Sequence, residues 1–500
     1  MNTNKRIIVI GGGIAGLSAG IYAQRSGFDV TIIEQHGIVG GMCTAWKRGG
    51  YFFEGAMHWM TGSSPKTEAY RLWVETGALG NSVAVHLHDP FRSIEWEGNV
   101  IHLYRDIDKT VAGLIALSPD DEKALRKLVK DVKAVTKMTM PIFDIKGVKM
   151  KNPKRMGLGF ILKMLPAMPT MSRYGKISCS EFVKAFKHPA IKRLFNIVPD
   201  GYSAIAIVST LATLDSGDGG YPEGGSLPMA QRMAETFASL GGKLKLHTHV
   251  KKVNIEHGRV TGVTIDDGIL TADAVIVTQE TIAAMNQLFD VRPNDAYLKT
   301  ICDTTKPAVC TFVSIGVRAE LPDITIPEWV LKAPITYAGQ KLYELSFNSY
   351  RHYAPEGGAA LTTALMADTY DFWKRAKEKG RYEAEKQALA EQFINALCEK
   401  YPECEDKIEV VDIATPLTYE RYTGAYHGSW MGIMEPGTSS GLMYPGSCEN
   451  VSGLYFAGHR LMPPGGLPVA LASGRQAAQL VCRDTGMVFD SEGSHCADLR

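Results

Sequence analysis

The chain has 500 residues, of which 45% are hydrophobic and 21% are charged, and its formal net charge is +1. This length exceeds what one ordinary hydrophobic core accommodates, so we expect a globular protein of two or three domains. The near-neutral charge gives no overall electrostatic argument for nucleic-acid binding, and we expect no nucleic-acid partner.

The nine cysteines form no C-x-x-C pair and no His/Cys cluster at zinc spacing, so we expect no metal site. Their odd number and scattered positions favour reduced thiols in a cytoplasmic protein. Residues 5–23 imitate a signal peptide or a short membrane span, but their glycines argue against both. No other apolar run is long enough to span a bilayer, so we do not expect an integral membrane protein.

The first 34 residues have the pattern of a strand, a tight turn, a helix and a second strand. Ile7–Ile10 is a short β-branched run, a helical stretch continues to about Ser26, and Phe28–Ile33 is the second strand. Such a βαβ unit is the core of a dinucleotide-binding fold.

Three glycines in this unit have the spacing G-x-G-x-x-G. Gly11 permits the tight turn, Gly13 lets the backbone approach a pyrophosphate, and Gly16 lets the helix pack closely on the strand. The helix N-terminus at Ile14 and Ala15 presents free N–H groups to phosphate.

Glu34 closes the second strand, 18 residues after Gly16. There its carboxylate can accept hydrogen bonds from a ribose 2′-hydroxyl, and it would repel a 2′-phosphate, which disfavours NADP. The motif predicts dinucleotide binding but does not choose between FAD and NAD.

Later elements follow from hydrophobic period and punctuation. We expect helices at 118–137 with Ser118 as N-cap, at 178–195 with an interruption near Pro189, at 227–240, at 381–400, and from about Val469. We expect strands at 243–250, 251–256, 259–266, 269–278, 360–366 and Leu454–Ala457, with a glycine-rich loop at 217–225.

A second glycine motif, Gly40-Gly41-x-x-Thr44, resembles the G-G-x-x-T element of the FAD-dependent amine oxidase and phytoene desaturase superfamily. Paired glycines remove the Cβ atoms that would block an extended dinucleotide. The following Gly50–Gly55 stretch, GYFFEG, resembles the family's G-Y/F-x-F-D-x-G segment. The resemblance implies FAD as cofactor, bound along Gly40, Gly41 and Thr44, with Met57 and His58 against the flavin.

The C-terminal stretch 453–478 resembles the closing flavin motif of bacterial phytoene desaturases, retinol saturases and carotenoid isomerases. The resemblance implies flavin contacts from Gly458, His459, Leu467, Pro468 and Val469, and backbone contact of Val250 with the adenine end. A helix N-terminus near Pro468 would stabilise an anionic reduced ring.

The resemblance implies an α/β fold. Its Rossmann-like FAD-binding domain would be built from the discontinuous segments 1–75, 217–285 and 445–490. The segments 76–216 and 286–444 would form a mixed α+β domain that faces substrate and membrane. The implied activity is desaturation, saturation or isomerisation of carbon–carbon bonds in a lipophilic polyene or isoprenoid. Two alternatives stay open: a flavin amine oxidase, and a non-catalytic escort protein for prenylated partners.

No catalytic side chain is compelled, because a flavin carries hydride chemistry itself. His58 is the candidate for a polar catalytic group near the flavin, or else a histidine satisfied in packing. His459 is the candidate for a flavin contact, or else a plain surface or loop histidine. Cys43 lies inside the second glycine motif, where covalent attachment to flavin is a remote alternative.

Two further features concern the substrate. Four aromatic residues, Tyr419, Tyr422, Tyr426 and Trp430, line an apolar channel or belong to the core. Residues 137–176 contain nine Lys/Arg, one acid and seven methionines. This composition favours peripheral contact with an anionic inner membrane surface, or a methionine-rich lid over the substrate. The substrate, the electron partner and the oligomeric state stay open.

Overall fold

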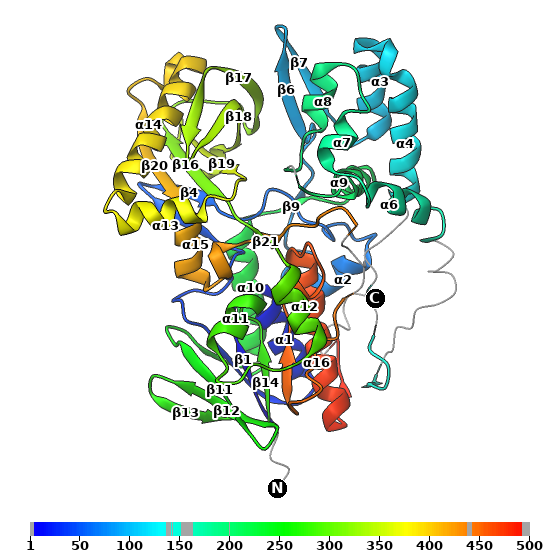
Figure 1. Ribbon diagram of the computed structural model, residues 1–500, viewed down its shortest axis with the longest axis vertical. Helices are drawn as coiled ribbons and strands as arrows, with labels where there is room; N and C mark the ends of the chain where they lie inside the picture. The colour runs from blue at the N-terminus through cyan, green and yellow to red at the C-terminus, as the bar shows by residue number, and fades with distance from the viewer. Residues whose placement is uncertain are drawn as a thin grey trace.

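A five-stranded parallel sheet lies at the base of the computed structural model, which describes residues 5–136, 142, 144–151, 164–199, 201–437 and 443–492 (Figure 1). Its order is β10 (Lys243–Lys245), β2 (Asp29–Ile33), β1 (Arg6–Ile10), β14 (Ala274–Val277) and β22 (Leu454–Phe456). Branched aliphatic side chains fill these strands, as expected for a parallel sheet buried on both faces. Three separated stretches of chain supply them, which confirms the α/β, Rossmann-like fold class. The domain limits proposed from the sequence stay a prediction.

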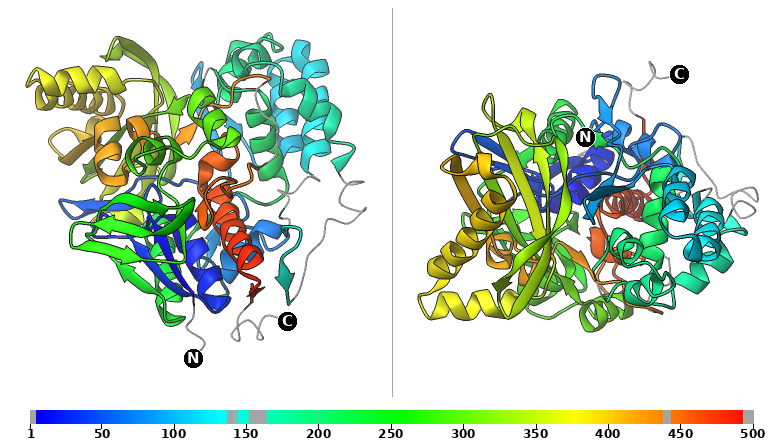
Figure 2. Two further views of the ribbon diagram at one scale, coloured as in Figure 1. Left: turned by 60° about the horizontal axis from the view of Figure 1, so that its bottom comes forward. Right: turned by 90° about the horizontal axis from the view of Figure 1, so that it is seen from above.

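Helices cover one face of this sheet and a small antiparallel sheet covers the other. The helices are α1 (Ile14–Arg25), α10 (Ser226–Ser239) and α16 (Leu467–Thr485), which share one buried core with alternate residues of the strands. Figure 2 shows α16 alongside α1. On the other face lie β11 (Val250–Glu256), β12 (Arg259–Ile265) and β13 (Gly268–Thr271), which pack through a second core.

A seven-stranded mixed sheet forms the upper left part of Figure 1. Its order is β20 (Ile408–Ala414), β16 (Thr311–Val317), β19 (Ala359–Leu365), β18 (Gln340–Tyr350), β17 (Ile324–Tyr337), β6 (Arg92–Trp96) and β7 (Asn99–Leu103). Two helices, α13 (Tyr370–Glu378) and α14 (Tyr382–Lys400), pack on it through Trp373, Leu389 and Phe393.

A helical layer forms the upper right part of Figure 1. It contains α3 (Ile107–Leu117), α4 (Glu122–Thr136), α6 (Met168–Tyr174), α7 (Cys179–Val183), α8 (Pro189–Phe195) and α9 (Ile205–Asp215). Their apolar sides share one core with β6 and β7. The mixed sheet and the helical layer are therefore joined through β6.

Shorter elements connect these layers. They are β3 (Ala45–Arg48), β4 (Tyr51–Glu54), α2 (Glu68–Glu75), β5 (Val85–His86), β8 (Lys149–Met150), β9 (Tyr221–Pro222), α11 (Thr281–Gln287), α12 (Ala296–Thr304), β15 (Pro307–Ala308), α15 (Pro416–Thr423), β21 (Met431–Gly432) and β23 (Val488–Phe489).

Three expected elements differ from the structure. The expected strand 243–250 ends at Lys245, because the chain turns at His247, whose φ is 50°. The expected strand 269–278 is two strands, β13 and β14, in different sheets. The expected helix 118–137 begins with a 3₁₀ turn, where the Ser118 hydroxyl donates to Asp121 and makes no capping hydrogen bond. The expected interruption of the helix 178–195 near Pro189 is confirmed, since α7 ends at Val183 and Pro189 begins α8.

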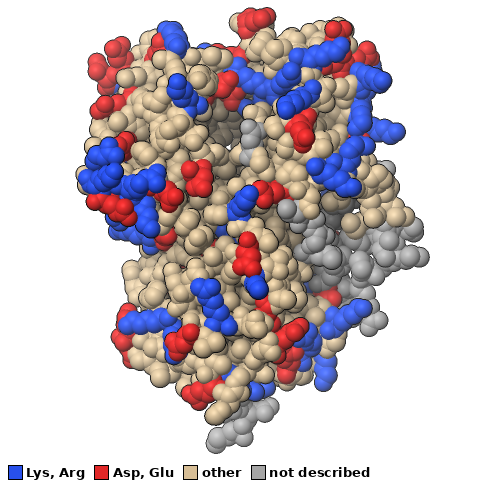
Figure 3. All heavy atoms as spheres, viewed as in Figure 1, with Lys and Arg blue, Asp and Glu red and all other residues tan. Residues whose placement is uncertain are grey.

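Positive and negative side chains are interspersed over the face shown in Figure 3. None of the helices within the described ranges is long and apolar enough to cross a bilayer. Within the same ranges, no cluster of His, Cys, Asp and Glu could hold a metal ion.

Candidate functional site

One cavity of about 1230 Å³ lies where the carboxyl ends of the parallel strands meet the mixed sheet and the helical layer. Gly11 follows β1, Glu34 follows β2, Thr278 follows β14 and Gly458 lies just beyond β22; all four line it. The carboxyl edge of a parallel sheet is where such folds bind nucleotides. A drug-sized ligand occupies about 300–1,000 Å³, so the cavity has room for more than one small molecule.

The first glycine motif forms the wall under α1. Gly11 has φ 106°, and a Cβ there would lie 2.8 Å from Thr278 Oγ1. A Cβ on Gly13 would instead point into open space, with Gly40 O the nearest atom at 3.8 Å. No side chain caps α1 at Gly13, so its first N–H groups are free for an anion. Ile14 and Ala15 line the cavity at this helix end.

The Glu34 carboxylate is held by two backbone N–H groups. Its Oε2 accepts the Gly12 N–H at 2.7 Å, and its Oε1 accepts the His36 N–H at 2.8 Å. Burial raises the pKa of this carboxyl, and the two N–H groups partly oppose that shift. Each carboxylate oxygen keeps a lone pair for a ribose hydroxyl.

The second glycine motif lies directly beside the first in the cavity wall. Gly40 has φ 118°, and a Cβ there would lie 2.3 Å from Cys43 O, so only glycine fits. Gly13 and Gly40 form a parallel bridge, which brings the two motifs into direct backbone contact. Because of this contact, the two motifs form one continuous wall of the cavity although they are separated in the sequence.

The structure brings together fifteen of the seventeen residues predicted to bind the cofactor. The cavity is lined by Gly11, Gly13, Ile14, Ala15, Glu34, Gly40, Gly41, Met57, His58, Val250, Gly458, His459, Leu467, Pro468 and Val469. The other two do not line it. Gly16 is in the first turn of α1, where a Cβ would be 1.9 Å from Gly11 O, so its role is close packing of the helix on the turn after β1. Thr44 accepts the Gly55 N–H at 3.1 Å through its carbonyl.

The N-terminus of α16 also lines the cavity. No side chain caps it, and its N-cap Gly466 has φ 96°. Leu467, Pro468 and Val469 line the cavity there. The positive end of this helix therefore faces the same cavity as that of α1, an arrangement suited to a ligand with negative charge at both places.

Both candidate histidines lie in the cavity wall and are neutral at physiological pH. Burial lowers the pKa of His58 to about 4, with His88 contributing. Burial lowers the pKa of His459 to about 3, with the Arg460 charge contributing. A neutral imidazole with so low a pKa is a poor general base near pH 7. Neither histidine has the protonation behaviour of an essential acid–base group.

Glu54 organises the backbone between the cofactor wall and the substrate wall. Fully buried, it accepts the Ser226 N–H at 2.8 Å and the Ala56 and Met57 N–H groups at 3.0 and 3.1 Å. Burial raises the pKa of its carboxyl. These bonds fix the turn that carries Met57 and His58 into the cavity. The thiol of Cys43, next to this turn, donates a hydrogen bond to Ser226 O at 3.5 Å. Burial raises the pKa of this thiol, so it stays protonated.

The part of the cavity away from the parallel sheet, here called the outer half, is formed by the mixed sheet and the helical layer and is largely apolar. Phe312 and Met366 line it from the mixed sheet, and Ala206 and Thr213 line it from α9. No pattern in the sequence marked α9 as part of the cavity wall, since its cavity-lining residues are small and scattered. Thr278 was also missed as a wall residue, although its place directly after a buried strand marks such a position.

The aromatic residues predicted to line one channel divide between different places. Tyr419 and Trp430 line the large cavity. Tyr422 is 40% exposed, and Tyr426 lines a separate small pocket, so the single-channel expectation is wrong for these two. The expected membrane or lid segment, 137–176, lies outside the described residues except at 142, 144–151 and 164–176.

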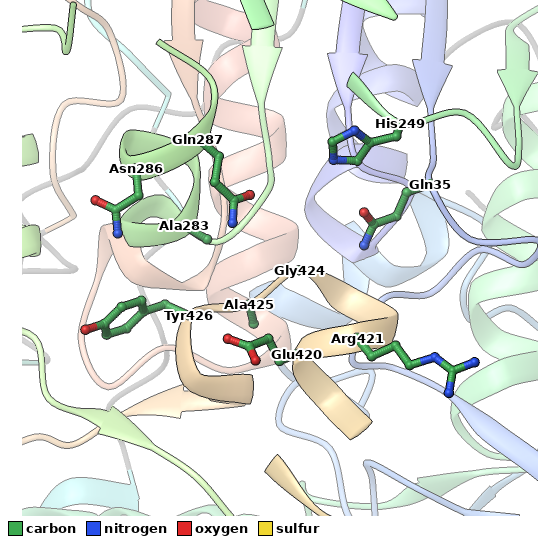
Figure 4. A pocket seen from close by; sticks show the side chains of 10 residues that line it. All are labelled: Gln35, His249, Ala283, Asn286, Gln287, Glu420, Arg421, Gly424, Ala425 and Tyr426. Atoms are coloured by element: carbon green, nitrogen blue, oxygen red, sulfur yellow. The ribbon is translucent and has the colours of Figure 1, made fainter. Parts of the chain in front are cut away.

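The small pocket of about 240 Å³, whose lining side chains Figure 4 shows, shares Gln35 and His249 with the wall of the large cavity. Gln35 and His249 come from the parallel-sheet part, Asn286 and Gln287 from α11, and Glu420 and Arg421 from α15. These are polar side chains, in contrast to the apolar outer half of the large cavity.

The residues fit an extended flavin dinucleotide. The cavity wall holds the uncapped N-termini of α1 and α16 and a glycine-rich loop. It also holds Gly13, which has no protein atom close to its Cβ position, and the Glu34 carboxylate, which lies where such folds bind a ribose. A bound FAD would be held by these groups and would supply hydride chemistry.

The protein family described as flavin containing amine oxidoreductase matches residues 14–482. Among curated proteins, 1-hydroxycarotenoid 3,4-desaturase of Flavobacterium sp. (strain P99-3) is 23% identical over 95% of this chain and 99% of its own length. Phytoene desaturase (lycopene-forming) of Paracoccus sp. is 24% identical, covering 96% and 98%. Chloroplastic prolycopene isomerase of Arabidopsis thaliana is 25% identical, covering 96% and 83%.

Solved structures show the same fold at lower identity. An oxidoreductase from Methanosarcina mazei has a TM-score of 0.59 at 17% identity, covering 95% of this chain and 99% of its own. Putrescine oxidase bound to putrescine has a TM-score of 0.60 at 15% identity, covering 96% and 99%.

Proposed function

Since this chain belongs to the family of flavin-containing amine oxidoreductases and is an FAD-dependent oxidoreductase, we propose that it desaturates, saturates or isomerises carbon–carbon bonds of a lipophilic polyene. The relatives that match along nearly the whole chain are named for carotenoid substrates. Transfer of that substrate class to this chain is our inference.

The continuity of the cavity is the observation that supports a polyene most directly. One space extends from the wall at Glu34 and Gly13, past Leu467, to Ala206 on α9. Its outer half is mostly apolar, as an extended hydrocarbon requires. A small polar amine would leave most of this apolar surface without contact.

The chain's own residues bind, orient and exclude water in this proposal. The free N–H groups of α1 and α16 hold the cofactor's polar groups, and Glu34 accepts from its ribose. Glu54 fixes the turn at Met57, so the substrate-side wall has one conformation. Phe312 and Met366 provide apolar contact for the substrate.

The amine oxidase and escort alternatives have less support. The amine oxidases found by structure resemble this chain at 14–16% identity, which establishes the fold alone. A Cβ on Gly13 would have Gly40 O as its nearest atom, at 3.8 Å, so no protein contact requires a glycine there. Close approach of a dinucleotide to this backbone would require it, which supports a bound dinucleotide.

The test uses purified holoenzyme in oxidised and in reduced form, under argon, with a panel of polyenes, unsaturated lipids and amines. We expect a polyene to isomerise or to change mass by two hydrogens, with a matching change in flavin absorbance where redox chemistry is net. Flavin reduction by an amine, with no polyene converted, would make the protein an amine oxidase.

We further propose that the protein contacts an anionic membrane surface peripherally through the described part of residues 137–176. Leu165 and Met168 are 51% and 55% exposed, beside the basic Arg173 and Lys176. Met171 of the same helix lines the cavity, so this surface adjoins the substrate space. Exposed apolar residues flanked by cations suit an anionic bilayer surface.

Vesicle sedimentation tests the membrane proposal. Protein should pellet with vesicles that contain anionic lipid, less so with purely zwitterionic vesicles, and less at high salt. A Leu165→Glu, Met168→Glu variant should stay in the supernatant. Equal pelleting of variant and wild type would assign any membrane contact to another surface.

A further inference from the structure

His58 and Tyr350 form a buried pair at the edge of the large cavity. The His58 Nδ1 and the Tyr350 hydroxyl oxygen are 2.5 Å apart, and the two rings are nearly parallel, at 17°. Tyr350 ends β18 and is 5% exposed, whereas the His58 ring lines the cavity. Because Nδ1 is engaged by the phenol, Nε2 is the ring nitrogen left for a ligand.

The protons of this pair have one consistent arrangement. Burial raises the pKa of Tyr350 well above its usual value, and burial lowers that of His58 to about 4. The phenol therefore keeps its proton and the imidazole is neutral. Among the described residues, the Tyr350 hydroxyl has His58 as its only hydrogen-bond partner. The tautomer in which the phenol donates to Nδ1 is therefore the one that leaves no buried phenol proton unpaired, and we assign it on that ground. The single imidazole proton is then on Nε2.

No hydrogen bond of His58 Nε2 is found among the described residues. The residues that flank His58 in the sequence and line the same cavity are Met57, Trp59 and Met60, whose side chains carry no oxygen acceptor. A donor left unpaired in an apolar site is unfavourable, so a ligand with an acceptor at this place gains relative to one without.

We propose that His58 is a specificity-determining residue whose Nε2–H donates a hydrogen bond to an oxygen atom of the substrate. The preferred substrates are therefore polyenes with a hydroxyl, carbonyl or carboxyl oxygen, and pure hydrocarbons are poorer ligands. This inference rests on the proposed function and narrows its substrate class.

Binding measurements with matched ligand pairs test the proposal separately from turnover. Holoenzyme is titrated with an oxygenated polyene and with its deoxygenated counterpart, and the ratio of the two dissociation constants is taken. We expect wild type to favour the oxygenated member by about tenfold or more. His58→Leu should reduce this ratio to below about twofold without weakening the hydrocarbon. His58→Gln should restore part of it, because its amide also donates.

His257→Asn, in an exposed turn, is the matched control and should keep the wild-type ratio. FAD content and circular dichroism establish that each variant is folded and loaded. An equal affinity of wild type for both ligands would overturn the proposal, and so would an unchanged ratio in His58→Leu. A change in flavin absorbance with an unchanged ratio would assign the His58 donor to the flavin. If a clear ratio is found but no polyene is converted, the proposed reaction fails and the recognition stands.

Discussion

The two halves of the cavity are built by different means. The cofactor half consists of backbone: glycines at Gly11, Gly13 and Gly40, and the free N-termini of α1 and α16. The substrate half consists of side chains from layers far apart in the sequence, such as Phe312 on β16 and Ala206 on α9. Backbone geometry needs particular residue types at fixed spacing, whereas an apolar wall accepts many side chains. The difference predicts that mutations in the two halves have separable effects.

The largest effect is expected from Gly13→Val in the cofactor half. The new side chain meets no protein atom closer than 3.8 Å at its Cβ and the φ of −75° suits valine, so the chain should fold. It would occupy the space of the pyrophosphate, and FAD affinity should fall by on the order of a hundredfold or more. FAD titration of the apoprotein measures this.

Gly113→Val, on the exposed side of α3, is the matched control, since a Cβ there meets nothing within 4 Å. It should retain full FAD content. A Gly13→Val protein that binds FAD like wild type would contradict the assigned cofactor wall.

The substrate half should respond to Ala206→Phe with a smaller and different loss. The larger side chain would fill part of the cavity beside α9, far from the cofactor glycines in the sequence. We expect unchanged FAD content and a fall of about tenfold or more in kcat/KM for the polyene. Loss of FAD with this variant would show that the two halves are not separable.

Glu54, between the halves, should produce a pH-dependent change in stability. Burial raises its pKa in the folded state above the unfolded value, so the protonated form is favoured by folding. The stability it contributes is present at low pH and is lost as pH rises through the folded pKa. Thermal midpoints of wild type should therefore fall relative to Glu54→Gln as pH rises from about 4.5. A difference that is constant across pH would contradict the raised pKa.

The smallest effect is expected in the pH dependence of turnover. His58 and His459 have pKa values lowered to about 4 and about 3, so both stay neutral at higher pH. The profile of kcat/KM should lack a histidine inflection between about pH 5.5 and 8.5. An inflection near pH 6.5 that disappears in His58→Gln would give His58 an acid–base role.

The same contrast explains what could be predicted from the sequence. The positions of Gly40 and of the strand before Thr278 could be found, because a positive φ and a buried parallel strand each require a narrow set of residues. The role of Gly16 in close packing could likewise be predicted from its spacing in the motif. Thr44 does not line the cavity, because a motif gives neighbours in sequence and not the direction of a side chain; its contact with the cofactor stays a prediction.

The substrate half could not be predicted in this way. The partners of His58 illustrate why: Tyr350 is 292 residues away and reaches it only because β18 ends beside the turn held by Glu54. Tyr422 and Tyr426 are near Tyr419 in the sequence but do not share its place. Tyr422, on α15, is exposed and contacts His36, and Tyr426 lies beyond Gly424, where α15 ends in a left-handed conformation. Long-range packing decides these positions.

A crystal structure of the holoenzyme with a bound polyene tests the central claim most directly. We predict that FAD lies along Gly13 and Gly40, and that the polyene extends from the flavin toward α9 within the same cavity. A polyene bound elsewhere, with the space between Met57 and Ala206 empty of it, would contradict the account.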